Sequence, residues 1–141
     1  MRLSHILAFS AVMVVAVASG GRCLAAQGTA ATARSSAARG KQLYGEYCAV
    51  CHGDDAKGDG TMASALTKAP SDLTTLASRN NGTFPEDKVT QYIQGSDQLK
   101  AHGSREMPVW GYAFRASTAS DVAAKTRIAN LVAYLKSVQA K

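Results

Sequence analysis

A chain of 141 residues is long enough for one domain and too short for two of ordinary size. Its 16 lysines and arginines against 10 acidic residues give a net charge of +6, but no dense basic run or aromatic platform among the lysines is present, which excludes nucleic acid as the expected partner. No segment alternates apolar and polar residues as a strand does, so the sequence predicts an all-α domain of four to five helices.

Residues 1–26 have the layout of a secretory signal peptide. Arg2 provides a positive start, an apolar run covers 6–18, and small residues precede the cleavage that we expect after Ala25 or Ala26. The alternative is an uncleaved membrane anchor, but spanning a bilayer takes about 20 apolar residues and this run is shorter. The sequence therefore predicts export to the periplasm and a mature chain with no membrane span.

Cleavage would also change the cysteine count and the charge. It removes Cys23, so that Cys48 and Cys51 are the two cysteines left, with no disulfide framework around them. Loss of Arg2 and Arg22 lowers the net charge from +6 to +4. This mild positive charge favours partner proteins that have acidic docking surfaces. We expect the mature protein to be a monomer.

The folded domain is expected over residues 37–141. Residues 27–36 are small and polar without apolar rhythm, which predicts a flexible mature N-terminus. From Ala37 to Val50, large apolar side chains recur every three or four positions, as on one face of a helix. Gly40 lies inside this helix, where glycine costs up to about 1 kcal/mol, and a glycine in such a place indicates close packing against another element.

The remaining segments are predicted from their turn residues and apolar spacing. A loop is predicted at 53–70 and a short helix at 71–82. A further helix is predicted at 83–95, with a Thr83/Glu86 capping box and a buried face formed by Val89, Tyr92 and Ile93. A long loop at 96–117 and a last helix at 120–139 follow. The last helix carries an apolar stripe formed by Val122, Ile128, Leu131, Val132, Leu135 and Val138. A loop as long as 96–117 is usually functional.

The motif that carries chemistry is Cys48-x-x-Cys51-His52. A structural zinc site needs four ligands, whereas His102 is the only other histidine of the expected mature chain. A thioredoxin-like redox pair belongs to a βαβ setting, which the helical pattern does not provide. The same spacing is the attachment signature of c-type haem, with two thiols reaching one porphyrin edge and the next residue placing its imidazole on the iron. The sequence therefore predicts one covalent haem c with His52 as an axial ligand.

The second axial ligand is assigned to Met107. Pro108 favours an extended backbone at Met107, which suits a side chain held out from a loop toward the iron. The alternatives are His102, Met62 or an open position. For His102 we favour an exposed polar residue, and for Met62 a loop side chain that covers apolar surface.

On these residues the chain resembles the class I monohaem cytochromes c, over residues 37–141. The resemblance implies a cytochrome c fold whose first and last helices cross around one haem. Gly40 and Tyr44 would then meet Leu131 and Tyr134, and Met107-Pro108 would match the axial methionine with its following proline.

The family also uses a proline carbonyl to fix the haem histidine, and Pro70 is the residue that the resemblance points to here. Trp110 has two compatible roles near the haem. Its indole N–H can donate to a haem propionate, or its ring can pack against the macrocycle, and we place packing first.

A six-coordinate iron has no vacant position for a substrate, so the expected function is one-electron transfer, not catalysis. The donor would be a quinol-oxidising complex or a dehydrogenase, and the acceptor an oxidase or reductase, with Lys57, Lys68 and Lys100 steering the docking. One alternative is a haem subunit or dedicated partner of a periplasmic dehydrogenase, with 111–119 as a docking loop. Another is a gas-binding cytochrome with an open axial position.

Overall fold

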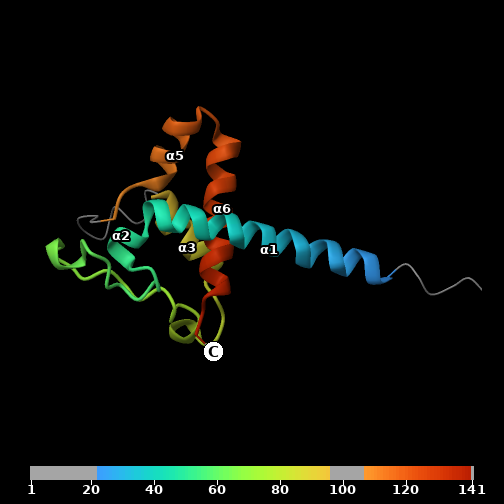
Figure 1. Cartoon of the computed structure of the whole chain (residues 1–141), viewed down its shortest axis with the longest axis horizontal. Coiled ribbons are helices and arrows are strands. Elements are labelled where there is room, and N and C mark those ends of the chain that lie inside the picture. The colour runs from blue at the N-terminus through green and yellow to red at the C-terminus, as the bar shows by residue number, and fades with distance from the viewer. Residues whose placement is uncertain (1–21, 96–106, 141) are drawn as a thin grey trace, which may run out of the picture.

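The structure, a computed structural model, describes residues 22–95 and 107–140, with side chains from Thr29 onward. All the regular elements in these ranges are helical, which confirms the predicted all-α class, and they are arranged around one crossing of two long helices (Figure 1). The α-helices are α1 (Arg22–Tyr47), α2 (Ala49–His52), α3 (Glu86–Gln94), α5 (Trp110–Thr118) and α6 (Asp121–Ser137). Two short 3₁₀ helices, η1 (Ala63–Ala65) and η2 (Ser78–Asn80), lie in the connection between α2 and α3.

The first helix begins earlier than predicted. α1 runs without interruption from Arg22, and so includes residues 27–36, for which the sequence predicted a flexible segment. Its N-terminal half extends away from the other elements (Figure 1), and most side chains of 29–39 are exposed. The prediction relied on the missing apolar rhythm, whereas alanine, which is abundant here, favours a helix without any buried face.

The crossing of α1 and α6 is a backbone contact. A Cβ atom on Gly40 would lie 1.9 Å from the carbonyl oxygen of Asn130 and 2.8 Å from the Cβ of Tyr134, so no larger residue fits. One turn further along α1, the Tyr44 ring packs on Tyr134 with 5.2 Å between ring centroids. This is the contact that the sequence predicted between the two helices, and Leu131 lies in the same buried cluster.

The core is formed mainly by α6. This helix starts at the N-cap Ser120, whose hydroxyl accepts a hydrogen bond from the Ala123 amide, and it presents most of the predicted stripe to the interior. Val122 is the exception: it is 75 % exposed, at the first turn. The buried apolar residues are Tyr44, Ala56, Val89, Ile93, Phe114, Ala124, Ile128, Leu131, Val132, Tyr134 and Leu135.

Two shorter predicted elements differ from the structure. The predicted helix at 71–82 is a series of turns that ends in η2, because Asp72 accepts from the amide and hydroxyl of Thr74 and so stabilises a turn. The predicted capping box of α3 is not formed, since Pro85 occupies the N-cap position without a side-chain cap. The buried face of α3 consists of Val89 and Ile93, whereas Tyr92 is 47 % exposed.

The predicted loop at 96–117 is wrong from Trp110 onward, where α5 begins. Gly111, a residue type typical of loops, lies inside this helix and marks a close approach to α3, since a Cβ there would lie 2.6 Å from the carbonyl oxygen of Gln94. An ion pair between Arg115 and Asp121, at 2.7 Å, joins α5 to the start of α6. The segment proposed as a docking loop, 111–119, is therefore mostly helical.

The crossing generates a first testable prediction. Gly40→Ala should lower the free energy of unfolding by about 2–3 kcal/mol, because the added methyl group overlaps the α6 backbone and the helices must separate. Chemical denaturation of the holoprotein followed by circular dichroism measures this change.

Gly45→Ala is the matched control, because it lies on the same helix with nothing within 4 Å of its Cβ position. It should stabilise the protein by about 0.5–1 kcal/mol through helix propensity. Equal stability of the two variants would contradict the close contact at Gly40.

Candidate haem site

A single helical turn brings the motif residues together. The amides of Cys51 and His52 both donate to the carbonyl of Cys48, at 3.1 and 2.9 Å, and the Gly53 amide donates to Ala49 at 2.8 Å. Residues three and four positions apart on a helix lie on one face, so Cys48, Cys51 and His52 are neighbours. The two thiols are free and partly buried, and no disulfide joins them.

Cys48 does not have the properties of a redox nucleophile. Burial, and secondarily the neighbouring Cys51, raises the pKa of Cys48 to about 12. A reactive thiol needs a lowered pKa, because the thiolate is the nucleophile. The setting of Cys48 therefore disagrees with a thiol that exchanges disulfides.

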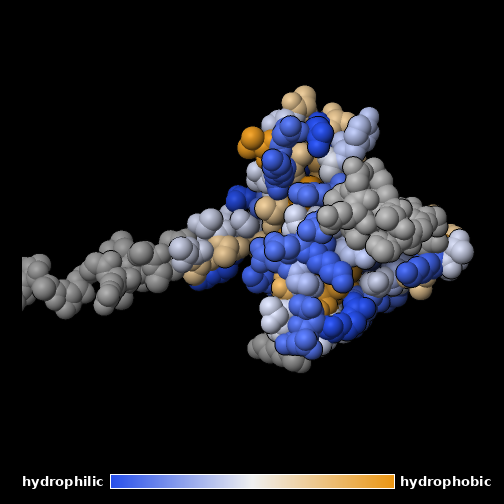
Figure 2. Space-filling model, turned by 180° about the vertical axis from the view of Figure 1, so that it is seen from behind, coloured by the Kyte–Doolittle hydropathy of each residue, from blue (hydrophilic) through white to orange (hydrophobic). Residues whose placement is uncertain are grey.

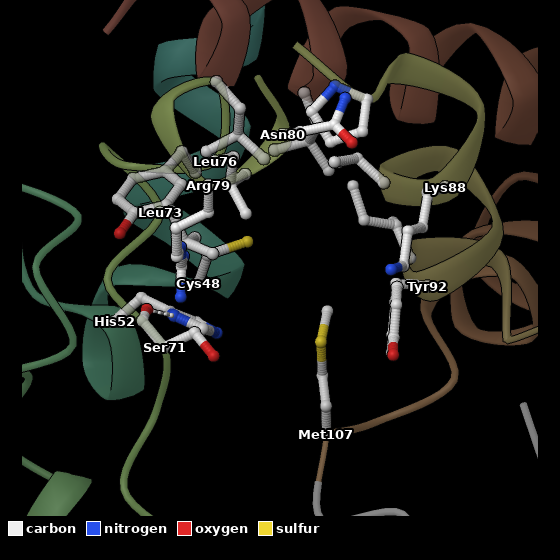
Figure 3. Close-up of a pocket in the computed structure, with 16 residues that line it drawn as sticks. Cys48, His52, Ser71, Leu73, Leu76, Arg79, Asn80, Lys88, Tyr92 and Met107 are labelled. Carbon is white, nitrogen blue, oxygen red and sulfur yellow. Dashed lines mark hydrogen bonds between the residues drawn. The ribbon is translucent and has the colours of Figure 1, made fainter. Parts of the chain in front are cut away.

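The His52 ring is held by a hydrogen bond to a distant part of the chain. Its Nδ1 lies 3.1 Å from the carbonyl oxygen of Ser71 (Figure 3), and because a carbonyl only accepts, Nδ1 carries the hydrogen. The lone pair is then on Nε2, which is the ring nitrogen that could act as a metal ligand. Burial lowers the pKa of His52 and so favours its neutral form, against the opposing effect of the Ser71 hydrogen bond.

The expected proline contact is displaced by one residue. Sequence reasoning assigned the carbonyl behind His52 to Pro70, whereas the structure places Ser71 there. The Pro70 carbonyl lies instead above Gly58, where a Cβ would approach it to 2.3 Å. The sequence therefore indicated the correct loop. It did not indicate which carbonyl of that loop contacts His52, because the connection between them is long.

A cavity of about 400 Å³ opens beside His52, within the range of small-molecule and cofactor sites. Cys48 and His52 lie on one wall, and Met107 extends into the cavity from a separate segment (Figure 3). The deeper walls are apolar, formed by Leu73, Leu76, Val89, Ile93, Leu131 and Leu135. Polar and charged side chains also line it: Arg79, Asn80, Lys88 and Tyr92.

The donor set and the cavity fit a covalent haem. An apolar hollow with an imidazole and a thioether facing it, and a thiol at its edge, offers the contacts that a porphyrin with central iron requires. Within the described ranges, no three His, Cys, Asp or Glu side chains gather to hold a metal ion by themselves. The zinc alternative therefore has no ligand set there.

The other residues singled out from the sequence lie elsewhere. Trp110 does not line the cavity; its ring packs against Tyr47 and Phe114, with centroids 5.3 and 5.7 Å away. Met62 is 48 % exposed, outside the cavity. His102 and Lys100 lie outside the described residues, while Lys57 and Lys68 are exposed.

Comparison with known proteins agrees with this geometry. The sequence profile of the family described as Cytochrome c matches residues 37–139, and the chain therefore belongs to the cytochrome c family. Members of this family transfer electrons through a covalently bound haem c, to and from redox partners. Searches among curated proteins and among solved structures gave no match. Among the described residues, no helix is long and apolar enough to cross a membrane.

The attachment motif generates a second prediction. Replacing both Cys48 and Cys51 by alanine should abolish covalent haem, because no thiol then remains in the motif to bond the porphyrin. Haem staining of a denaturing gel, normalised to protein by immunoblot, measures retention. Cys23→Ala should keep wild-type staining, and a stained double variant would contradict the assignment.

Proposed function

We propose that this cytochrome c is a one-electron carrier in which His52 and Met107 are the two axial ligands of the haem iron. The observation that supports this assignment is that both side chains line the same cavity although they come from distant parts of the chain. The iron would supply reversible one-electron chemistry. A thioether opposite an imidazole favours the ferrous state and raises the reduction potential.

The chain's own residues would set the conditions of that exchange. The Ser71 carbonyl holds the His52 ring, and the aliphatic walls from α3 and α6 would keep water from the metal. With both axial positions filled, no position is left for a substrate. We therefore propose a carrier and not an enzyme.

The place of action follows from the N-terminal segment. We propose that residues 1–26 direct export and are removed, and that the mature monomer carries electrons in the periplasm between a quinol-oxidising complex or dehydrogenase and an oxidase or reductase. The excess of basic residues suits partners with acidic surfaces. Figure 2 supports a freely dissolved carrier, because hydrophilic side chains cover most of the described surface on the face shown.

A dedicated subunit of a periplasmic dehydrogenase is the second candidate. It is favoured by α5, an ordered helix whose Tyr112 side chain is 73 % exposed, as a docking element would require. Gel filtration of a native extract separates the two: co-elution with a large partner supports the subunit, and elution near the size of one chain supports the carrier.

The ligand assignment generates a third prediction. In Met107→Ala, the ferric protein should lose its thioether-to-iron charge-transfer band, and the equilibrium constant for reduction should fall roughly 10-fold or more. A spectroscopic redox titration of protein matured in a haem-attaching periplasm gives both values.

Met62→Ala is the control, since Met62 is exposed and outside the cavity. It should keep the band and the potential. A band that survives in Met107→Ala would refute the assignment, and carbon monoxide binding to the reduced wild-type protein at neutral pH would favour an open axial position.

The charged lining of the cavity generates a fourth prediction. Arg79 and Lys88 are exposed cations that line a cavity with apolar walls, so we propose that they neutralise the haem propionates. Lys88→Gln should then lower the equilibrium constant for reduction by about 2- to 3-fold, because loss of a nearby positive charge favours ferric iron. Lys125→Gln removes the same charge from α6 outside the cavity and should have no comparable effect; equal shifts would contradict the role of Lys88.

A further inference from the structure

Tyr44 contacts three parts of the molecule at once. Its side chain is 2 % exposed, its ring packs on Tyr134 of α6, and it forms part of the haem cavity. Its hydroxyl donates a hydrogen bond of 2.7 Å to the carbonyl of Gly53. The helix crossing would need only an aromatic ring at this position, so the hydroxyl contact calls for its own explanation.

The accepting residue directly follows the haem histidine. Gly53 has φ of +79°, where the chain leaves the helical turn, and a Cβ there would lie 2.0 Å from Oδ1 of Asp59. A larger residue would not fit in this turn, and its first peptide unit is joined directly to His52. The hydroxyl of Tyr44 ties it to α1 over nine residues.

The His52 ring is already oriented from its other side by Ser71. The Ser71 contact fixes rotation of the imidazole, whereas a bond to the following peptide fixes the distance of the His52 backbone from the cavity. Two independent contacts therefore position His52. The Ser71 carbonyl holds its side chain, and the Tyr44 hydroxyl holds the peptide that follows it. Hydrogen bonds made behind a metal ligand tune the metal by orienting that ligand.

The phenol remains a donor under all ordinary conditions. Burial is the main cause that raises the pKa of Tyr44 above its usual value, and the neighbouring Cys48 adds to it. Gly53 also accepts from the Ala56 amide at 3.1 Å, so removal of the hydroxyl leaves no carbonyl without a donor. A phenylalanine variant is therefore expected to fold.

We infer that Tyr44 is a positioning residue for the axial histidine: its hydroxyl couples the crossing of α1 and α6 to the placement of His52 beside the haem iron. This inference rests on the proposed role of His52. It gives the Tyr44 hydroxyl a function distinct from packing, and it predicts that removing one oxygen atom changes the electronic environment of the iron.

The test compares Tyr44→Phe with Tyr134→Phe in the holoprotein. Both variants remove one hydroxyl from the same aromatic pair, but in the described parts of the chain no hydrogen bond from the Tyr134 hydroxyl is found, and its ring does not line the cavity. Electron paramagnetic resonance of the ferric protein reports ligand orientation, redox titration reports the potential, and denaturant unfolding reports stability.

Tyr44→Phe should change the resonance g values and lower the equilibrium constant for reduction about 3-fold, because a loosened turn admits water that favours ferric iron. For a one-electron couple this equals about 28 mV, at 59 mV per ten-fold change. Tyr134→Phe should keep the wild-type g values and potential.

Two results would overturn the inference. One is wild-type g values and potential in Tyr44→Phe. The other is an equal change in both variants, which would assign the effect to packing at the crossing. Failure of the proposed Met107 ligation is recognised separately, because the wild-type protein would then lack the charge-transfer band while the comparison of the two variants still tests His52.

Discussion

The structure depends on one contact between two backbones, at Gly40. Because this residue has no side chain, α1 approaches the carbonyl of Asn130 more closely than any other residue type would allow. That approach sets the position of Tyr44 one turn later and of Cys48 one turn after that. A single steric constraint thus places the start of the haem motif relative to the core of α6, and the cavity forms beside it.

The candidate site combines local and distant contributions in different ways. Cys48, Cys51 and His52 are brought together by one helical turn, which needs no tertiary structure. The cavity walls, by contrast, come from the loop after Ser71, from α3 and from α6. The local part provides two thiols and an imidazole, and the distant part provides the apolar walls and the Ser71 carbonyl that bonds the His52 ring.

This division explains how much could be predicted from the sequence. The attachment motif, the helical class and the meeting of Gly40 with α6 were predictable, because each depends on spacing or on a residue type that has few other uses. The carbonyl behind His52 was placed at Pro70 instead of Ser71, because its register depends on a loop whose turns have no periodic signal.

Helix α5 was missed because Gly111 serves close packing on Gln94 while looking like a helix breaker. Sequence reasoning did not identify Arg79 and Lys88 as lining residues of the cavity, because exposed cations have no distinctive sequence pattern. Their positions depend on how the cavity walls are assembled.

The crossing of α1 and α6 also has a consequence for the order of folding. It joins residues near the start and the end of the domain, so its contacts have a large sequence separation and need both helices to be present. A chain that lacks α6 leaves the groove at Gly40 open and cannot close its core. The segments before α6, including the Cys48–His52 motif, therefore cannot reach their final packing until the whole domain has been synthesised.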